Sequence, residues 1–146
     1  MPFELSCKCE YVLLALLELA THHPTGDRLQ IRQIATRQNI PERYLEQLLL
    51  VLRKGGLVQS MRGMHGGYLL ARTPKEITLL EVLECIEGGT TVDNTPCETQ
   101  PTDSVVVQEV WQETQQAAHE VLSACTLQTL LERRDAKQQS GMMYYI

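Results

Sequence analysis

The sequence predicts a mainly α-helical fold with one small β-hairpin. Apolar residues recur at helical spacing in six separate stretches, and two short strand-like runs lie between the third and fourth of these stretches. The predicted order is therefore three helices, a hairpin, a fourth helix, a polar loop, a long helix and a short final helix. Apolar residues make up 43% of the chain, which is enough to form a hydrophobic core between these elements.

The first three predicted helices are bounded by helix-breaking residues. The first covers about 5–21 and is followed by the turn HHPTGD. A short second helix covers 31–38, and the third begins beside Pro41, because a proline in the first turn of a helix loses no hydrogen bond. The third helix carries an apolar stripe of leucines and stops at Gly55 and Gly56.

A hairpin and a capped helix follow. Two short strands, Leu57–Arg62 and Tyr68–Arg72, are joined by the glycine-rich tip GMHGG. Thr78 starts the fourth helix, and Glu81 stands three residues later, which is the spacing of a capping box. We expect this helix to end at Gly88 and Gly89.

Three short helices followed directly by a hairpin is the order of a winged helix-turn-helix DNA-binding domain. In that fold the third helix enters the major groove, and the hairpin, or wing, reaches the backbone or the minor groove. The chain therefore divides into a winged helix-turn-helix domain over 1–87, a polar sensor loop over 88–103 and a dimerisation region over 104–146. The last region holds a long amphipathic helix, about 104–124, and a short helix, about 127–135.

Charge is distributed unevenly along the chain. Residues 1–75 contain ten Lys and Arg and six Asp and Glu, a net charge of +4. Residues 76–146 contain three and twelve, a net charge of -9. A basic front half suits a DNA-facing surface, and an acidic rear half suits a solvated or dimerising one. A protein-interaction module that uses the acidic half is the alternative, and salt-sensitive binding to duplex DNA distinguishes the two.

Several classes of protein are disfavoured by the sequence. The apolar runs are shorter than the roughly 20 residues of a membrane span, and the first residues lack the features of a signal peptide. The five cysteines are odd in number and scattered, unlike a secreted disulfide framework. No G-x-S-x-G motif, phosphate-binding glycine loop or H-E-x-x-H motif occurs. We therefore expect a cytoplasmic protein that is not an enzyme and does not contact a membrane.

Polar residues on the third helix and the hairpin tip are the candidate DNA contacts. Glu46 and Gln47 can read base edges, and the cations of the same face, such as Arg43, can meet phosphates. Arg62 lies beside the glycine-rich tip, where the backbone can approach DNA closely, and arginine is favoured in a narrow minor groove. An ordinary solvated helix face is the alternative interpretation of the helix residues.

Several stretches of the chain form a recognisable pattern: RYLEQLL, LRKGGLV, RG, GGYLLAR, ITLLEVLECIEG, a lone Trp111 and TLQTLL. On these stretches, within about 5–133, the chain resembles the Rrf2 family of bacterial transcription regulators, which includes iron–sulfur and nitric-oxide sensors. The resemblance implies that the protein binds double-stranded DNA as a homodimer. The implied DNA contacts are Arg43, Tyr44, Glu46, Gln47, Arg62, Gly63, His65 and Gly66.

Two departures from the family's pattern concern DNA sequence preference. Met64 and His65 replace a proline-glycine pair at the wing tip, and Pro41 and Arg43 replace small hydroxyl residues at the start of the third helix. The preferred DNA sequence therefore does not carry over from relatives. The family dimerises through its long helix, whose apolar stripe here is longer than one small domain needs. The implied dimer residues are Val107, Val110, Trp111, Thr114, Ala118 and Val121.

The resemblance also raises the question of an iron–sulfur cluster. Cluster-binding relatives carry three close cysteines in the loop before the long helix, whereas this sequence has only Cys97 there. Some relatives complete the site with an acidic residue of the partner subunit's first helix, which corresponds to Glu10, and Cys7 and Cys9 stand beside it. One hypothesis is a cluster, [2Fe–2S] rather than [4Fe–4S], held by Cys97 and these residues of the partner. Free thiols are the alternative.

The two remaining cysteines, Cys85 and Cys125, lie in apolar helical stretches, and we expect them in the core. The sequence thus predicts a homodimeric DNA-binding regulator, a repressor, that senses redox or iron–sulfur status. The alternative in the same family is a cluster-free regulator that responds to thiol oxidation or to a partner protein. Colour distinguishes the two, because an iron–sulfur protein absorbs visible light.

Overall fold

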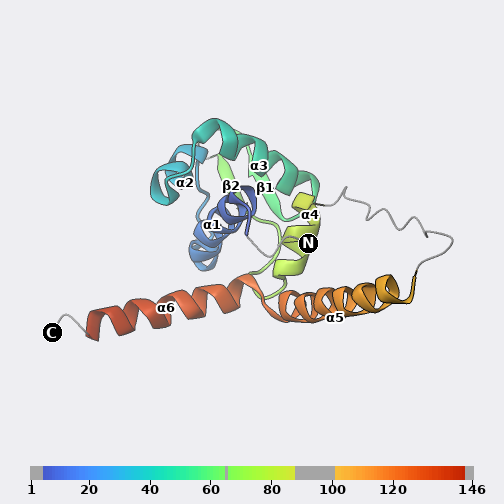
Figure 1. Ribbon diagram of the computed structural model, residues 1–146. Coiled ribbons are helices and arrows are strands. Elements are labelled where there is room, and N and C mark those ends of the chain that lie inside the picture. Colours follow the sequence, from blue (N-terminus) through green and yellow to red (C-terminus); the bar gives the residue numbers. More distant parts are fainter. Residues whose placement is uncertain (1–4, 65, 88–100, 144–146) are drawn as a thin grey trace.

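The computed structural model describes residues 5–64, 66–87 and 101–143, and Figure 1 shows a mainly helical fold with one hairpin. The described elements follow the predicted order, which confirms the predicted fold class. In sequence they are α1 (Cys7–Thr21), a short 3-10 helix (His23–Thr25), α2 (Ile31–Gln38), α3 (Glu42–Lys54), β1 (Val58–Met61), β2 (Gly67–Leu70), α4 (Leu79–Glu87), α5 (Thr102–Ala124) and α6 (Leu127–Met143).

Different helices lie on the two opposite sides of the molecule. Helices α2 and α3 lie on one side of the body, and α5 and α6 lie end to end along the opposite side, so that the outer part of each points away from the body (Figure 1). Helix α6 packs on α1, and α5 packs on α4. None of the described helices is long and apolar enough to cross a membrane.

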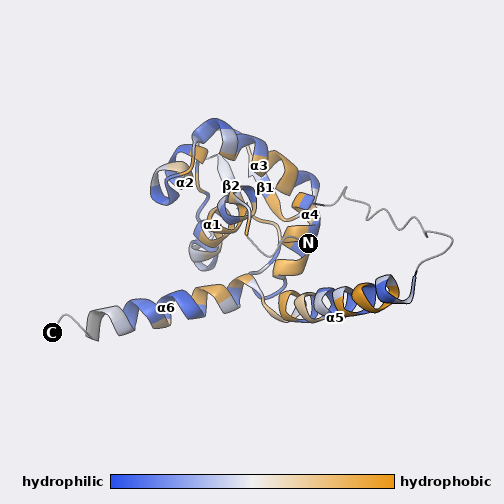
Figure 2. Ribbon diagram, viewed as in Figure 1, coloured by the Kyte–Doolittle hydropathy of each residue, from blue (hydrophilic) through white to orange (hydrophobic). Residues whose placement is uncertain are grey.

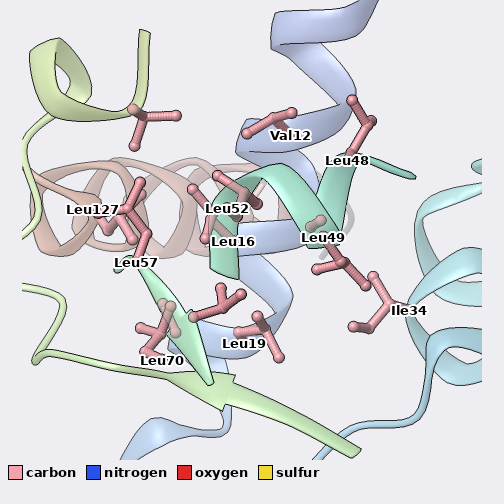
Figure 3. Packing of buried hydrophobic residues seen from close by; sticks show 14 of the residues in the cluster. Val12, Leu16, Leu19, Ile34, Leu48, Leu49, Leu52, Leu57, Leu70 and Leu127 are labelled. Carbon is pink, nitrogen blue, oxygen red and sulfur yellow. The ribbon is translucent and has the colours of Figure 1, made fainter. Parts of the chain in front are cut away.

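The core is made of leucines and other aliphatic residues from almost every element of the body (Figure 3). Among the described residues, no polar or charged side chain is buried. Leu16 of α1, Leu57 before β1 and Leu127 of α6 are all within this cluster, so the last helix starts inside the core that the earlier elements form. Burying one such side chain contributes roughly 1.5–3 kcal/mol, so the contact of α6 with the body is a stable one.

The apolar stripe of α3 fixes how this helix is rotated. Leu45, Leu48, Leu49 and Leu52 recur at helical spacing, and all four are buried. The remaining faces of α3 must therefore point outward, which is where the polar residues of the sequence lie. The predicted end of the helix is also correct: Gly55 still has helical backbone angles, and Gly56 has a φ of 76°, which favours glycine.

The hairpin is shorter than predicted, but its register is regular. Val58 pairs with Leu70 and Met61 with Gly67. The first strand is one residue shorter than predicted at each end, whereas the second begins one residue before its predicted start and ends two residues before its predicted end. A third segment was not foreseen: Leu29, from the loop before α2, exchanges two backbone hydrogen bonds with Tyr68, with N···O distances of 3.0 and 2.7 Å. These bonds attach the base of the wing to the helix-turn-helix unit.

The fourth helix carries the predicted capping box. The Glu81 N–H donates to Thr78 Oγ1 at 3.2 Å, and the Thr78 N–H donates to Glu81 Oε2 at 3.4 Å. Its predicted end at Gly88 and Gly89 lies outside the described residues. The prediction placed Pro41 inside the first turn of α3, and the structure places it one position earlier, as the N-cap.

Two predictions about the C-terminal region were wrong. The last helix is not short, because it continues from Leu127 to Met143. Its apolar periodicity ends near position 135, but the good helix formers Ala136, Lys137, Gln138 and Gln139 follow, all of them exposed, and they favour continuation of the helix. Cys125 is not in a helix: it has extended backbone angles in the joint between α5 and α6. Its carbonyl accepts the Leu79 N–H at 2.9 Å, which ties this joint to the start of α4.

Gly55, in the turn between α3 and the wing, lies in close contact with Cys85 of α4. A Cβ at Gly55 would overlap Cys85 Sγ of α4, while the φ of Gly55, -78°, is acceptable for any residue. We predict that Gly55→Ala lowers the free energy of unfolding by about 1–3 kcal/mol through overpacking, measured by urea unfolding at fixed protein concentration.

The double variant Gly55→Ala/Cys85→Ala should recover most of that loss, because the smaller side chain of residue 85 makes room for the new methyl group. Gly141→Ala is the control, since a Cβ there meets nothing within 4 Å. A Gly55→Ala protein as stable as the parent would show that this contact does not constrain the turn.

Candidate nucleic-acid interface

The exposed face of α3 carries the polar residues that the sequence singled out. Arg43, Glu46 and Gln47 are all exposed, and the buried leucines on the other side of the helix leave them no other orientation. Figure 2 shows hydrophilic turns on the outer side of α2 and α3, opposite α5 and α6. The structure thus brings these three predicted contacts together on one accessible surface.

Tyr44 differs from its neighbours. Its side chain is half-buried and packs edge-to-face on Tyr11 of α1, with ring centroids 5.8 Å apart and an interplanar angle of 77°. This contact gives Tyr44 a structural role between α3 and α1. A DNA contact by the same residue stays a prediction.

The wing tip is a compact turn with little room for side chains. The Gly66 N–H donates to the Gly63 carbonyl at 2.9 Å, and Gly63 has a φ of 110°. A Cβ at Gly66 would lie 2.5 Å from the Met61 carbonyl oxygen, so only glycine fits. Arg62, Gly63 and Met64 are exposed, and Gly66 is half-buried. His65, another predicted contact, lies outside the described residues.

The exposed charges on the two sides of the body differ in sign. Six cations of α2, α3 and the wing are exposed: Arg32, Arg37, Arg43, Arg53, Lys54 and Arg62. On α5 the exposed charges are carboxylates: Asp103, Glu109, Glu113 and Glu120. The basic face can approach a polyanion, whereas α5 would be repelled by it.

Helix α5 exposes the apolar stripe that the sequence predicted for dimerisation. Val107 and Val121 are each 68% exposed, Val110 is 57% exposed, and Trp111 is 43% exposed. Thr114 and Ala118 lie between them and are half-buried. An apolar stripe of this length in contact with water is unusual for a monomeric protein.

The described thiols do not form a metal centre. Among the described residues no group of three or more His, Cys, Asp and Glu side chains could hold a metal ion. Cys7 and Cys9 are two residues apart within α1, which places them on opposite sides of the helix: Cys7 is exposed and Cys9 is 2% exposed. The hypothesis that both point to one site is therefore not supported. Glu10 is exposed, and Cys97 lies outside the described residues.

The thiol of Cys9 forms a hydrogen bond with a residue of α4. Its thiol donates to Glu87 Oε1, at the end of α4, with an S···O distance of 3.5 Å. Burial raises the pKa of the Cys9 thiol, and the Glu87 carboxylate raises it further. Burial also raises the pKa of Cys85, whose thiol donates to the Val51 carbonyl at 3.7 Å. Both groups therefore favour the protonated thiol, which is neither a metal ligand nor a nucleophile.

Comparison with known proteins decides the family. A family model described as "Rrf2: Iron-dependent Transcriptional regulator" matches residues 5–133. The chain belongs to the Rrf2 family. This confirms the resemblance on which the sequence analysis relied, over the same residues.

Relatives of this Rrf2 protein match it over nearly its whole length. The HTH-type transcriptional regulator CymR of Bacillus subtilis is 36% identical over 141 residues, which cover 97% of this chain and 99% of CymR. The regulator IscR of Photorhabdus laumondii is 33% identical over 141 residues, covering 94% of this chain and 84% of IscR. The chain is therefore a transcriptional regulator and not an enzyme, as predicted, and regulators of this family bind DNA.

Solved structures agree with these relatives. The structure of T. potens IscR superposes with a TM-score of 0.77 at 36% identity, covering 94% of this Rrf2 chain and 93% of that one. The structure of CymR, described as the global cysteine regulator of B. subtilis, gives a TM-score of 0.76 at 34% identity, covering 90% and 98%. Both neighbours are Rrf2 regulators with the winged-helix fold, which identifies β1 and β2 as the wing.

The exposed wing tip leads to a prediction. Arg62→Ala should weaken binding to duplex DNA by about 1–3 kcal/mol, because one good arginine contact is lost. The matched control is Arg133→Ala, which removes the same charge from the exposed surface of α6. Equal affinities of the two variants in a fluorescence-anisotropy titration would contradict a role for the wing.

Arg134 is a poorer control than Arg133, although both lie on α6. Its Nη1 donates to Thr21 Oγ1 at 2.8 Å, so it fastens α6 to the end of α1. Removing it would change the structure as well as the charge.

Proposed function

We propose that the protein is a homodimeric repressor that places the two copies of α3 in successive major grooves of a near-palindromic DNA site. The observation that carries this proposal is the exposed apolar stripe of α5, a helix that lies on the side of the body opposite α3 (Figure 1). Two copies that pair through α5 cover the stripe and leave both α3 helices and both wings accessible.

The length of the stripe supports a helix–helix interface. From Val107 to Val121 it spans four helical turns, about 21 Å, because a helix rises 1.5 Å per residue. Its members are small or β-branched, with Trp111 as the large exception, so two such helices can approach closely. A two-fold dimer requires half-sites related by symmetry, about one helical turn or a multiple of it apart.

We infer that the signal enters through Cys97 as a thiol. The described donors do not fit an iron–sulfur cluster, because Cys9 is committed to Glu87 and faces away from Cys7. Cys9 and Cys85 favour the protonated form, and Cys125 is half-buried in the α5–α6 joint. Cys97 lies in the sequence between α4 and α5, the two helices that link the DNA-binding body to the proposed dimer interface. A response to thiol chemistry there can change the spacing of the wings.

Footprinting tests the proposed mode of DNA binding. We expect the protein to protect two symmetric half-sites on a duplex selected from a random pool, and to lower transcription from a promoter that contains this site. Absence of any protected duplex at low salt would contradict the proposal.

A charge on the α5 stripe tests the dimer. We predict that Val110→Glu and Val121→Glu each yield monomers or aggregates in sedimentation and lose the symmetric footprint, because a carboxylate cannot be buried unpaired in the interface. Gln112→Glu is the control, since it adds the same charge to the exposed polar side of α5. A soluble dimer of parent stability from both valine variants would show that the interface lies elsewhere.

Serine substitutions test the signal. We predict that anaerobically purified protein has no visible absorption and no bound iron, and that hydrogen peroxide changes its DNA affinity. Cys97→Ser should abolish this response, whereas Cys7→Ser, which alters the other exposed candidate, should retain it. Stoichiometric iron with visible absorption that is lost in Cys97→Ser would instead support the cluster hypothesis, and a parent-like response of Cys97→Ser would exclude Cys97 as the sensor.

A further inference from the structure

A cleft of about 590 Å³ lies where the end of α3, the turn to the wing and α4 meet. Its volume is in the range of sites that hold small molecules. Two cations and two carboxylates line it: Lys54 at the end of α3, Arg72 after β2, and Glu81 and Glu84 of α4. The charges of these four side chains sum to zero, so the cleft does not select a polyanion.

Two of the four charged groups are paired with each other. Arg72 Nη2 donates to Glu81 Oε2 at 2.8 Å, and Arg72 Nη1 donates to Glu81 Oε1 at 3.5 Å. Glu81 also accepts the Thr78 N–H in the capping box of α4. This ion pair is therefore part of the framework of the cleft, because it ties the chain after β2 to the first turn of α4.

The other two charged groups, Lys54 and Glu84, remain available. Among the described residues neither of them forms an ion pair or a side-chain hydrogen bond. Both side chains are exposed, so a dissolved molecule can reach them. They come from different helices and line the same cleft. The cleft thus offers one positive and one negative group to a ligand that carries both charges.

The rest of the lining is uncharged. Val51 and Leu57 contribute aliphatic side chains, and Gly55 contributes backbone only. Burial raises the pKa of the Cys85 thiol, so this group is protonated and only weakly polar. A ligand with an apolar body and two opposite charges matches this set, and an α-amino acid with an apolar side chain is a simple molecule of that kind.

We propose that the cleft binds an α-amino acid with an apolar side chain, whose carboxylate pairs with Lys54 and whose ammonium group pairs with Glu84. Hydrogen bonds between charged groups are roughly twice as strong as neutral ones, and two of them fix the orientation of the ligand. The aliphatic lining of the cleft receives the side chain of the ligand.

The bound amino acid acts on DNA binding through Lys54. This residue is one of the exposed cations of α2, α3 and the wing, and the turn at Gly55 and Gly56 follows it directly. A carboxylate on Lys54 neutralises this cation, so the ligand lowers the affinity of the protein for a polyanion. This regulatory role rests on the proposed DNA-binding function, whereas occupation of the cleft does not.

Binding of amino acids to the full chain tests the site in the absence of DNA. The probes are L-valine, L-leucine and L-methionine, followed by shift changes in a heteronuclear NMR spectrum. We expect saturable changes at the residues that line the cleft, with a dissociation constant on the order of millimolar, because the ligand has few atoms. Absence of saturable binding by all three probes would overturn the site.

Two derivatives of leucine test recognition of both charges. N-acetyl-L-leucine lacks the ammonium group, and L-leucinamide lacks the carboxylate. Each should bind about tenfold more weakly than L-leucine, or less, because one charged hydrogen bond is lost. Derivatives that bind as tightly as L-leucine would show that the cleft does not recognise a zwitterion, which overturns the proposal.

Substitutions locate the ligand. Glu84→Gln and Lys54→Gln should each weaken binding of L-leucine by about tenfold. Both side chains are exposed, so the variants should keep the melting temperature of the parent. Glu76→Gln is the matched control, because Glu76 is an exposed carboxylate that precedes α4 and does not line the cleft. Parent-like leucine affinity in both cleft variants would place the ligand elsewhere.

The effect on DNA separates the regulatory role from the proposed function. Saturating L-leucine should weaken binding of the parent to a duplex selected from a random pool by about fivefold or more, and by linkage the duplex should weaken leucine binding by the same factor. Glu84→Gln should bind this duplex like the parent and lose the response to leucine. An unchanged DNA affinity with leucine bound would overturn the regulatory role alone. If the parent binds no duplex at low salt, the proposed function and the regulatory role both fail, and the NMR titration still decides the site.

Discussion

The rotation of α3 about its own axis is the constraint on which the interface depends. Four buried leucines at helical spacing hold one side of this helix against the core, and each would lose roughly 1.5–3 kcal/mol if it were turned outward. No other rotation buries the same set, so the exposure of Arg43, Glu46 and Gln47 follows from core packing rather than from any contact of their own. The turn at Gly55 and Gly56 then sets the direction of the wing from the end of the same helix.

Two further attachments keep the wing and α3 in one rigid unit. Leu29 joins β2 through paired backbone hydrogen bonds, and Arg53 joins β1 through Ser60. On the far side, Leu127 is buried in the core and the Cys125 carbonyl is bonded to the start of α4. The joint between α5 and α6 is therefore fixed to the body that carries α3, so that in the proposed dimer a change in how the two α5 helices pair would move both bodies as units.

Much of this architecture was predictable because its signals are local. Helical periodicity, the glycines after α3 and the capping box at Thr78 each act within a few residues, and the structure has each of them. Contacts between distant residues were not predictable. The Leu29–Tyr68 bridge, the Arg53–Ser60 pair and the Cys9–Glu87 contact depend on how elements meet in space, and no spacing in the sequence encodes them.

The length of α6 was predicted wrongly because apolar periodicity marks only the part of a helix that packs on the core. Apolar periodicity reports only the part of a helix that packs, so it located the contact of α6 with the core and missed the rest of the helix. From Asp135 onward the described side chains of α6 are exposed, and helix propensity alone continues the element. The same limit applies to the interface, since pattern identifies which face of α3 is exposed but not which cations of neighbouring elements converge there.

The separation of charge gives the two sides of the molecule different roles in binding DNA. Exposed carboxylates on α5 and exposed arginines around α3 and the wing belong to elements on opposite sides of the body, and salt screens charges over roughly 8 Å in the cell. In the proposed complex the arginines attract the phosphates, and the carboxylates disfavour contact through α5. An encounter with DNA would thus be biased toward the face that carries α3, and the apolar stripe on α5 would remain available to the proposed second copy. The overall charge of -5 does not by itself oppose DNA binding, because the exposed carboxylates of α5 lie on a helix on the side of the body opposite α3.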